Sequence, residues 1–222
     1  MHRPAACLFD LDGLLLDTEP LHARAWQEAA SHFGRPLEPE ELMALRGRRR
    51  HDCADQVRRW IAAAGGPVLS RGELLAVRQP IAEALLPTAA PMPGAPELVQ
   101  TCTALAVPMA LATSSSREAV MLKAAPHPWL KPIVVRVHGD DPELAAGKPA
   151  PDVFLLAAAR LGVKASTCWA FEDSPAGARS ARDAGCTVHV LPPAHLSAEE
   201  RVHLYPGIEH FLANLSEVRL PQ

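Results

Sequence analysis

The sequence has no apolar run that approaches the roughly 18 residues needed by a membrane-spanning helix. The apolar stretch after Arg3 is short and is broken by Asp10, so this segment lacks the pattern of a signal peptide. The five cysteines are odd in number and none are paired at CxxC spacing, which is typical of reduced thiols. These absences predict a cytoplasmic protein with no membrane partner.

Histidine metal motifs and a strong charge imbalance are also missing. The ten histidines include no HExxH or HxH arrangement, which argues against a zinc site. The net charge of -3 gives no reason to expect nucleic acid as a partner. The 222 residues, of which 48% are hydrophobic, are enough to bury a sizeable core. We therefore expect a globular protein that acts on small molecules, and we expect it to be a monomer.

Short apolar runs recur along the chain and predict the strands of one sheet. Because the runs are nearly continuous rather than alternating, they indicate parallel strands buried on both faces. Helical patterns lie between most of them, so we expect an α/β fold with a doubly wound, Rossmann-like parallel sheet. The predicted strands are Ala5–Leu11, Met109–Thr113, Ile133–His138, Cys168–Glu172 and Thr187–Leu191.

Three helices of this core have recognisable starts. Ser115 and Glu118 form a predicted capping box before a helix over Ala119–Ala125. Pro151 and Asp152 suit the first turn of a helix over Val153–Leu161. Ser174 and Pro175 suit the N-cap and first residue of a helix that ends before Gly185.

One stretch, between Asp17 and about Pro91, has helical patterns and no convincing strand. Such an all-helical insert after the first strand predicts a cap that closes over the carboxyl edge of the sheet. We expect a core of residues 1–16 and 92–222 and a cap of residues 17–91. The predicted cap helices are Leu21–Phe33, Glu38–Leu45, about Asp52–Ala64, and about Ser70–Leu86 with a kink at Pro80.

Asp10 and Asp12 end the first predicted strand. Side chains two apart on an extended segment point the same way, so both carboxylates face one pocket. Two such charges repel by roughly 4 kcal/mol at 4 Å and an effective dielectric near 20. The pair therefore needs a cation, a proton or a substrate beside it.

Three more polar clusters follow later strands, and parallel strands present their carboxyl ends at one edge. Transfer of a phosphoryl group to a carboxylate needs such a set, because Mg²⁺ and a second cation offset the repulsion between two anions. In this interpretation Asp10 is the nucleophile, Asp12 the acid and base, and Lys148 a cation for phosphoryl oxygens. The Thr113 hydroxyl donates a hydrogen bond, and the carboxylates of Asp10, Glu172 and Asp173 supply a Mg²⁺ site. The clusters are Thr113-Ser114-Ser115, Gly147-Lys148-Pro149 and Glu172-Asp173.

With these motifs in this order, the whole chain resembles the haloacid dehalogenase superfamily of phosphatases with a helical cap. The resemblance implies Asp10 as nucleophile and a Mg²⁺ ion held by the Asp10 carboxylate, the Asp12 backbone carbonyl and the acidic pair Glu172 and Asp173, chiefly Asp173. The motifs that carry it are Phe9-Asp10-Leu11-Asp12-Gly13, Leu111-Ala112-Thr113-Ser114-Ser115, Gly147-Lys148-Pro149-Ala150-Pro151-Asp152 and Phe171-Glu172-Asp173-Ser174-Pro175-Ala176-Gly177.

Within that superfamily, Leu14–Glu19, Pro87–Ala95 and Gly139–Glu143 resemble the pseudouridine-5′-phosphatase branch. Thr18, His22 and Arg24 with Trp26 also resemble the β-phosphoglucomutase branch. The first branch implies hydrolysis of a sugar phosphate or nucleoside monophosphate, and the second implies a sugar phosphomutase. A metabolite-binding module without activity is a further alternative, which the complete set of motifs disfavours.

Three residues outside the catalytic set are candidate substrate contacts: Ser114, His22 and Arg50. His22 is either a site residue or a packed helix histidine. The run Arg46–His51 is either a solvated loop with one arginine turned inward or a site in which Arg50 binds the distal end of the substrate. A nucleic-acid patch is disfavoured, because no stacking aromatic residues surround this run.

Overall fold

The computed structural model describes residues 3–221, and its central layer is a six-stranded sheet in the order β3-β2-β1-β4-β5-β6. All neighbouring strands are parallel, which confirms the predicted doubly wound α/β class. The strands are β1 (Ala6–Phe9), β2 (Met109–Ala112), β3 (Val135–Val137), β4 (Cys168–Glu172), β5 (Thr187–Val190) and β6 (His210–Phe211).

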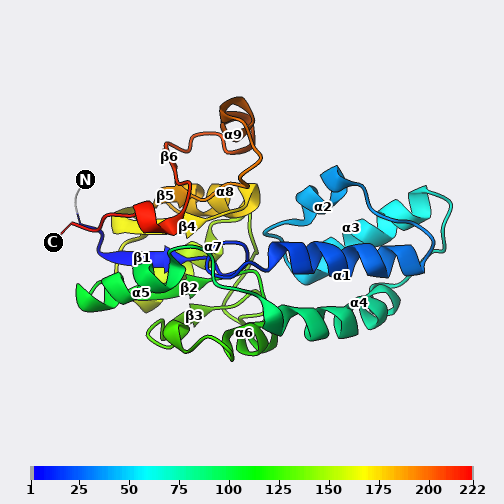
Figure 1. The fold of residues 1–222 in the computed structure, drawn as a ribbon, viewed down its shortest axis with the longest axis horizontal. Helices are drawn as coiled ribbons and strands as arrows, with labels where there is room; N and C mark the ends of the chain where they lie inside the picture. Colours follow the sequence, from blue (N-terminus) through cyan, green and yellow to red (C-terminus); the bar gives the residue numbers. More distant parts are fainter. Residues whose placement is uncertain (1–2, 222) are drawn as a thin grey trace.

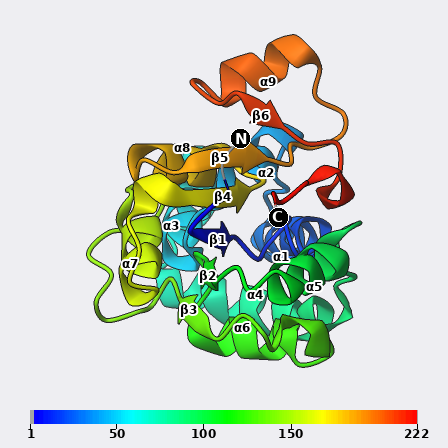
Figure 2. The same ribbon diagram turned by 90° about the vertical axis from the view of Figure 1, so that its left-hand side faces the viewer.

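Helices cover both faces of this sheet (Figures 1 and 2). Successive residues of β1 point to opposite faces, so Cys7 and Phe9 belong to one apolar cluster whereas Ala6 and Leu8 belong to another. The first cluster includes residues of α5 (Ala95–Ala104) and α6 (Arg117–Ala124). The second includes residues of α7 (Asp152–Arg160), α8 (Pro175–Asp183) and, through Tyr205, the segment after α9 (Ala198–Leu204). Burial of both faces explains why the strands lack polar alternation.

Four of the helices between β1 and β2 form a separate helical lobe beyond the carboxyl ends of the strands (Figure 1). The helical lobe has its own apolar cluster, which includes Trp26, Val57, Ile61 and Leu74. Its first and last connections lie side by side, since Leu16 and Pro91 form an antiparallel bridge. The helices are α1 (Glu19–His32), α2 (Pro39–Leu45), α3 (Arg50–Ala63) and α4 (Arg71–Leu85), the last of which continues through Pro80.

Several details differ from the predictions. The predicted capping box at Ser115 is wrong: Ser116 is the N-cap of α6, and its hydroxyl accepts a hydrogen bond from the Ala119 backbone N–H. The prediction for Ser174 is confirmed, because its hydroxyl accepts from the Gly177 backbone N–H at 3.0 Å. The short edge strand β6 and helix α9 were not predicted, because neither has a long apolar run of its own.

Within residues 3–221, every helix is too short or too polar to cross a bilayer.

Gly94 lies at the start of α5, where the chain returns from the helical lobe to the core. Its backbone φ is +84°, and a Cβ there would lie 2.3 Å from the backbone nitrogen of Ser216. Gly34 has a similar φ of +81° with nothing within 4 Å of its Cβ position, so it is a matched control. The left-handed conformation costs an alanine roughly 1–2 kcal/mol at either position. The clash adds roughly 1–3 kcal/mol at Gly94 alone.

We therefore expect Gly94→Ala to lower the free energy of unfolding more than Gly34→Ala does, as measured by urea denaturation. Equal losses for the two variants would show that the segment around Ser216 moves away from α5 without cost.

Candidate active site

The polar clusters predicted from the sequence meet at the carboxyl edge of the sheet. Asp10 follows β1, Thr113 follows β2, and Glu172 and Asp173 lie at the end of β4. Lys148 comes from the loop between β3 and α7. All five side chains are buried, although each is polar or charged. Buried charges require partners, so the contacts among these side chains decide what the site can do.

Lys148 is the partner of two carboxylates. Its ammonium lies 2.5 Å from Oδ1 of Asp10 and 2.5 Å from Oε1 of Glu172. Burial disfavours the charged amine, but the two carboxylates outweigh this effect and raise the pKa of Lys148 above its usual range. For Asp10, burial outweighs the attraction of Lys148 and raises the pKa to about 7. The protein therefore holds Asp10 close to a permanent cation without fully stabilising its negative charge.

Glu172 lies behind this pair rather than at the open side of the site. Its second oxygen, Oε2, accepts from the backbone N–H of Asp173 at 3.1 Å and of Ser174 at 3.2 Å. The backbone passes very close here, since a Cβ at Gly177 would lie 1.8 Å from Oε1 of Glu172. Both oxygens of Glu172 are thus engaged by the protein itself.

Asp173 has an oxygen that lacks a partner. The carboxylates of Asp10, Glu172 and Asp173 each offer an oxygen within 4.8 Å of the others. Oδ1 of Asp173 is buried and accepts no hydrogen bond from the described residues, whereas Oδ2 accepts from Arg46 at 2.5 Å. Burial raises the pKa of Asp173 to about 6, although Arg46 lowers it. A buried, unpaired oxygen among carboxylates suits a hard divalent cation.

The backbone after Asp12 also approaches this acidic cluster. Gly13 has a φ of +81°, and a Cβ there would lie 2.3 Å from Oδ2 of Asp173. Only glycine leaves that space open, and only glycine adopts this conformation without strain. The peptide that joins Asp12 to Gly13 therefore lies beside the carboxylates. A metal site that includes the Asp12 backbone carbonyl requires this position.

Asp12 has a different environment from Asp10. Its Oδ1 accepts from the Thr18 hydroxyl at 2.7 Å, and its Oδ2 accepts from the Ser115 hydroxyl at 2.7 Å. The Lys123 ammonium lies 2.5 Å from Oδ1 and 2.6 Å from Oδ2. Desolvation would raise the pKa of Asp12, but Lys123 and His22 outweigh it and hold that pKa well below its usual range. Two neighbouring carboxylates therefore have opposite pKa shifts, which is typical of groups with different catalytic roles.

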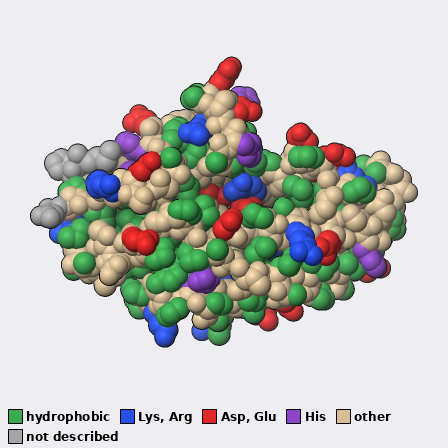
Figure 3. Space-filling model, viewed as in Figure 1, with side chains coloured by type: hydrophobic (Ala, Val, Ile, Leu, Met, Phe, Trp, Pro, Cys, Tyr) green, Lys and Arg blue, Asp and Glu red, His purple; other side chains and the backbone are tan. Residues whose placement is uncertain are grey.

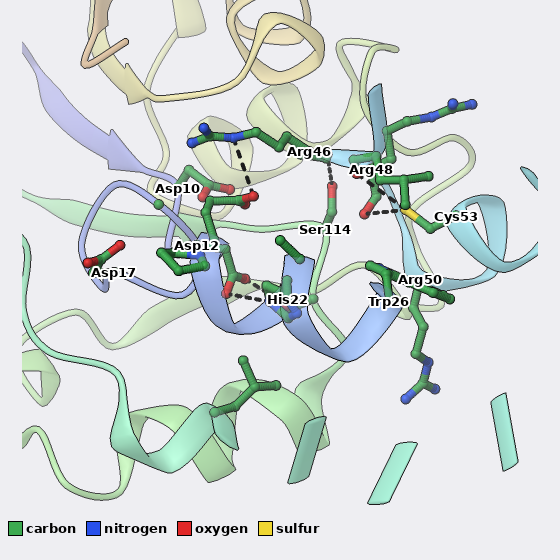
Figure 4. Close-up of a pocket in the computed structure, with 18 of the residues that line it drawn as sticks. Asp10, Asp12, Asp17, His22, Trp26, Arg46, Arg48, Arg50, Cys53 and Ser114 are labelled. Atoms are coloured by element: carbon green, nitrogen blue, oxygen red, sulfur yellow. Dashed lines mark hydrogen bonds and ion pairs between the residues drawn. The ribbon is translucent and has the colours of Figure 1, made fainter. Parts of the chain in front are cut away.

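His22 lies on α1 and contacts Asp12. Its Nε2 is 3.2 Å from Oδ1 of Asp12 (Figure 4). Its Nδ1 is 2.8 Å from the Arg78 guanidinium. An arginine only donates, so Nδ1 accepts and Nε2 carries the hydrogen that is donated to Asp12. Burial lowers the pKa of His22, which agrees with this neutral form. Arg78 is itself buried, and its guanidinium lies 4.5 Å from the Trp26 ring centroid.

A loop of the helical lobe, residues 46–49, contacts the core beside Asp10 (Figure 4). Arg46 pairs with Asp173 at 2.5 Å and with Glu19 at 3.3 Å. The Ser114 hydroxyl donates to the Gly47 carbonyl at 2.9 Å. Ser114, predicted as a substrate contact, thus holds this loop against the core.

One cavity of about 730 Å³ connects the two parts of the molecule. Asp10, Asp12 and Thr113 line its core side, and Trp26 and Arg50 line its lobe side. Arg50 donates to the Gln79 side chain at 3.0 Å and lies far from Asp10 in Figure 4. The surface over this junction carries acidic and basic side chains together (Figure 3). The volume suits a small metabolite rather than a polymer.

Sequence reasoning missed two cations of the site, Lys123 and Arg46. Lys123 stands in the last turn of α6, where a lysine normally complements the helix dipole in solvent. Arg46 is the first residue of a basic run in which nothing distinguished one arginine from another. No sequence signal separated either residue from a solvated one.

Comparisons with known proteins agree with this geometry. A model of the family described as haloacid dehalogenase-like hydrolase matches residues 4–185. The chain is 39% identical over 210 residues to the probable pseudouridine-5′-phosphatase of Drosophila melanogaster, covering 91% of this chain and 88% of that protein. It is 33% identical over 194 residues to (DL)-glycerol-3-phosphatase 2 of Arabidopsis thaliana, covering 85% and 80%. The solved structure of CbbY from Rhodobacter sphaeroides with xylulose-1,5-bisphosphate is similar, with a TM-score of 0.78, 26% identity and 96% of each chain covered.

Removal of Lys148 would leave two buried carboxylates without their counter-ion. We expect Lys148→Met to lower the free energy of unfolding by roughly 3–5 kcal/mol near pH 8. Without Lys148 the folded-state pKa values of Asp10 and Glu172 rise further, because the ammonium lowers both. A carboxyl with a raised folded-state pKa contributes stability at low pH and loses it as the pH rises through that value.

Urea denaturation of metal-free protein should therefore show a smaller loss at pH 5.5 than at pH 8. Lys164→Met, which changes an exposed lysine, is the control and should be neutral at both pH values. A pH-independent loss for Lys148→Met would show that its packing, and not its charge, stabilises the fold.

Proposed function

This chain belongs to the haloacid dehalogenase-like hydrolases, and we propose that it is a Mg²⁺-dependent phosphatase that hydrolyses small phosphomonoesters through an aspartyl-phosphate on Asp10. The observation that carries this proposal is that Asp10 pairs with Lys148 and shares a buried acidic cluster with Glu172 and Asp173, in which Oδ1 of Asp173 has no partner among the described residues. The similarity to the two phosphatases reported above supports it.

Asp10 is the proposed nucleophile. Lys148 donates a hydrogen bond to Oδ1 of Asp10, and none of the described side chains donates to Oδ2. Oδ2 is therefore able to attack phosphorus. Lys148 also provides positive charge beside the transferred group. Thr113 accepts from the Ser115 backbone N–H at 3.1 Å, so its own hydroxyl hydrogen is available to a phosphoryl oxygen.

Asp12 is the proposed acid and base. In the first step the protonated form of this carboxyl would donate its proton to the leaving oxygen, and in the second step the ionised form would take a proton from water. The depressed pKa of Asp12 suits the second step, because an ionised carboxylate is the form that accepts a proton. The contacts of Thr18 and His22 with Asp12 link this residue to α1 of the helical lobe.

The acidic cluster fits a divalent cation. Asp10 and Asp173, with Glu172 behind them and the Asp12 backbone carbonyl beside them, would hold Mg²⁺. When bound, the ion would offset the repulsion between Asp10 and a dianionic phosphate.

We assign residues 17–91 to a cap domain and residues 1–16 and 92–222 to the core domain. The bridge between Leu16 and Pro91 supports this division, because it brings the two connections together. Arg46 and Gly47 of the lobe contact the core and line the cavity beside Asp10. Full closure of the lobe would exclude water from the reacting atoms and restrict the site to small substrates.

Sugar phosphates and nucleoside monophosphates are the proposed substrates. The cavity joins an aromatic ring, Trp26, to hydrogen-bonding groups on His22 and Arg50, which suits a sugar or base with several hydroxyl or carbonyl groups. A sugar phosphomutase is the alternative function, favoured by the Thr18, Asp12 and His22 contacts together with Arg50 as a distal phosphate ligand. A binding module without activity has no observation in its favour.

A phosphate-release screen tests the proposal. We expect hydrolysis of at least one ester in a panel that includes pseudouridine 5′-phosphate, glycerol 3-phosphate and fructose 1-phosphate with Mg²⁺. EDTA should abolish this activity and Mg²⁺ should restore it. Ca²⁺ should support it poorly, because its looser coordination misplaces the phosphoryl group. Full activity of metal-free protein would contradict the metal assignment.

One arm of the screen separates the two functions. The enzyme is incubated with β-glucose 1-phosphate and trace glucose 1,6-bisphosphate, and glucose 6-phosphate is followed together with free phosphate. Formation of glucose 6-phosphate many times faster than phosphate release from any ester would replace the phosphatase with the mutase.

Asp10→Asn should bind substrate and lose turnover, because an amide oxygen does not attack phosphorus effectively. Isotope labelling from ³²P-substrate should mark the wild-type chain after an acid quench and should not mark Asp10→Asn. Asp52→Asn, on the exposed surface of α3, is the control and should keep full activity. Steady-state turnover by Asp10→Asn, once deamidation is excluded by mass spectrometry, would rule out the covalent mechanism.

A further inference from the structure

Lys123 is the one fully buried lysine ammonium of the described residues that the proposed mechanism does not use. It lies on α6 in the core, with no exposed side-chain surface. A buried ammonium is costly unless each of its N–H groups has a partner. Its partners therefore indicate why the chain keeps a lysine at this position.

All three N–H donors of Lys123 are engaged. Two bind Oδ1 and Oδ2 of Asp12 at 2.5 and 2.6 Å, and the third binds the Ser115 hydroxyl oxygen at 2.7 Å. Ser115 then donates its own hydrogen to Oδ2 of Asp12 at 2.7 Å. Every donor hydrogen of Lys123 and Ser115 in this group has an acceptor. Lys123 and Ser115 therefore fix both the position and the plane of the Asp12 carboxylate.

The two halves of the molecule hold Asp12 in different ways. Thr18 and His22 reach it from α1 and the connection before it, and both contact only Oδ1. Lys123 and Ser115 reach it from α6 and the loop before α6, and they account for both contacts of Oδ2. The contacts of Lys123 and Ser115 with Asp12 do not depend on where the helical lobe lies. The contacts of Thr18 and His22 with Asp12 do depend on it.

Each carboxylate of the site pairs with a particular cation, and Lys123 is the one that pairs with Asp12. Lys148 pairs with Asp10 and Glu172, Arg46 pairs with Asp173, and Lys123 pairs with Asp12. Within residues 3–221 no second lysine or arginine pairs with Asp12. Without Lys123, Asp12 would keep its hydrogen bonds with Thr18, His22 and Ser115 but would have no paired lysine or arginine to fix its carboxylate.

We propose that Lys123 is a positioning residue for the reaction: together with Ser115 it holds the Asp12 carboxylate beside Asp10 from the core side, so that proton transfer to and from Asp12 is aligned before the helical lobe closes. This inference rests on the proposed phosphatase function. Lys123 does not contact the substrate in this role and acts only through Asp12.

The first test is the kinetics of Lys123→Met, which keeps the length of the side chain and removes its charge. We expect kcat to fall at least about 100-fold, the lower end of the contribution of general acid–base catalysis. KM should stay within about threefold, because Lys123 is not a substrate contact. Ser115→Ala, a smaller change, should lower kcat less. Lys131→Met, at an exposed position, is the matched control and should behave as wild type.

The second test is a double-mutant cycle with Asp12→Asn, read as residual turnover of p-nitrophenyl phosphate. If Lys123 acts through Asp12, Lys123→Met should cost little further activity in the Asp12→Asn background. The same cycle is read as melting temperature. Asp12→Asn leaves the Lys123 charge buried without its carboxylate, so Asp12→Asn/Lys123→Met should melt at a higher temperature than Asp12→Asn alone.

Additive losses of activity in the two variants, or a kcat of Lys123→Met equal to that of wild type, would overturn the role of Lys123 and leave the phosphatase function intact. A larger rise in KM than fall in kcat would also overturn it, because it would make Lys123 a binding residue. Absence of phosphate release by the wild type would overturn both proposals together.

Discussion

Carboxylates crowded at one edge of the sheet are the constraint on which the rest of the site depends. Asp10, Glu172 and Asp173 are buried, and Asp12 stands beside them. Parallel strands β1 and β4 are neighbours, so the residues that follow them meet at distances where like charges repel strongly. Three cations offset this repulsion: Lys148 pairs with Asp10 and Glu172, Arg46 with Asp173, and Lys123 with Asp12. Each cation comes from a different segment of the chain.

Those cations make the carboxylates chemically different. Lys148 is shared between two acids and leaves the pKa of Asp10 raised, whereas Lys123 serves one acid and leaves the pKa of Asp12 depressed. Asp10 and Asp12 are two residues apart at the end of one strand, and the sequence alone gives no reason for their pKa values to shift in opposite directions. Their difference arises from which loop reaches each of them: the loop before α7 reaches Asp10, and α6 reaches Asp12.

The sequence predicted the core of this arrangement well, for a physical reason. A buried parallel strand needs a continuous apolar run, so β1, β2, β4 and β5 were visible as patterns, and the residues that end them fall at one edge whatever the details of packing. The doubly wound fold class and the superfamily resemblance were confirmed. The short strand β6 and helix α9 lie at the edge of the sheet, where a few residues suffice and the pattern is weak.

Residues on helices were harder to place, because a helical side chain finds its partner only after the helix packs. Lys123 resembled a solvated residue at a helix end, and Ser115 resembled a capping residue, yet in the folded chain both side chains donate to the Asp12 carboxylate. The same limit applies to the basic run of the helical lobe, where Arg46 reaches the acidic cluster and Arg50 lines the cavity.

Arg46 links the position of the helical lobe to the charge of the acidic cluster. Its guanidinium pairs with Asp173, a member of the acidic cluster, and the next residue, Gly47, accepts a hydrogen bond from Ser114 of the core. A Cβ at Gly47 would lie 2.1 Å from the Ser174 hydroxyl oxygen, so the loop can pack this closely only because it has a glycine there. Any cation added to the cluster lowers the negative charge that attracts Arg46. The contact that holds the loop against β4 is therefore weakened by the same charge that would prepare the site for a phosphate.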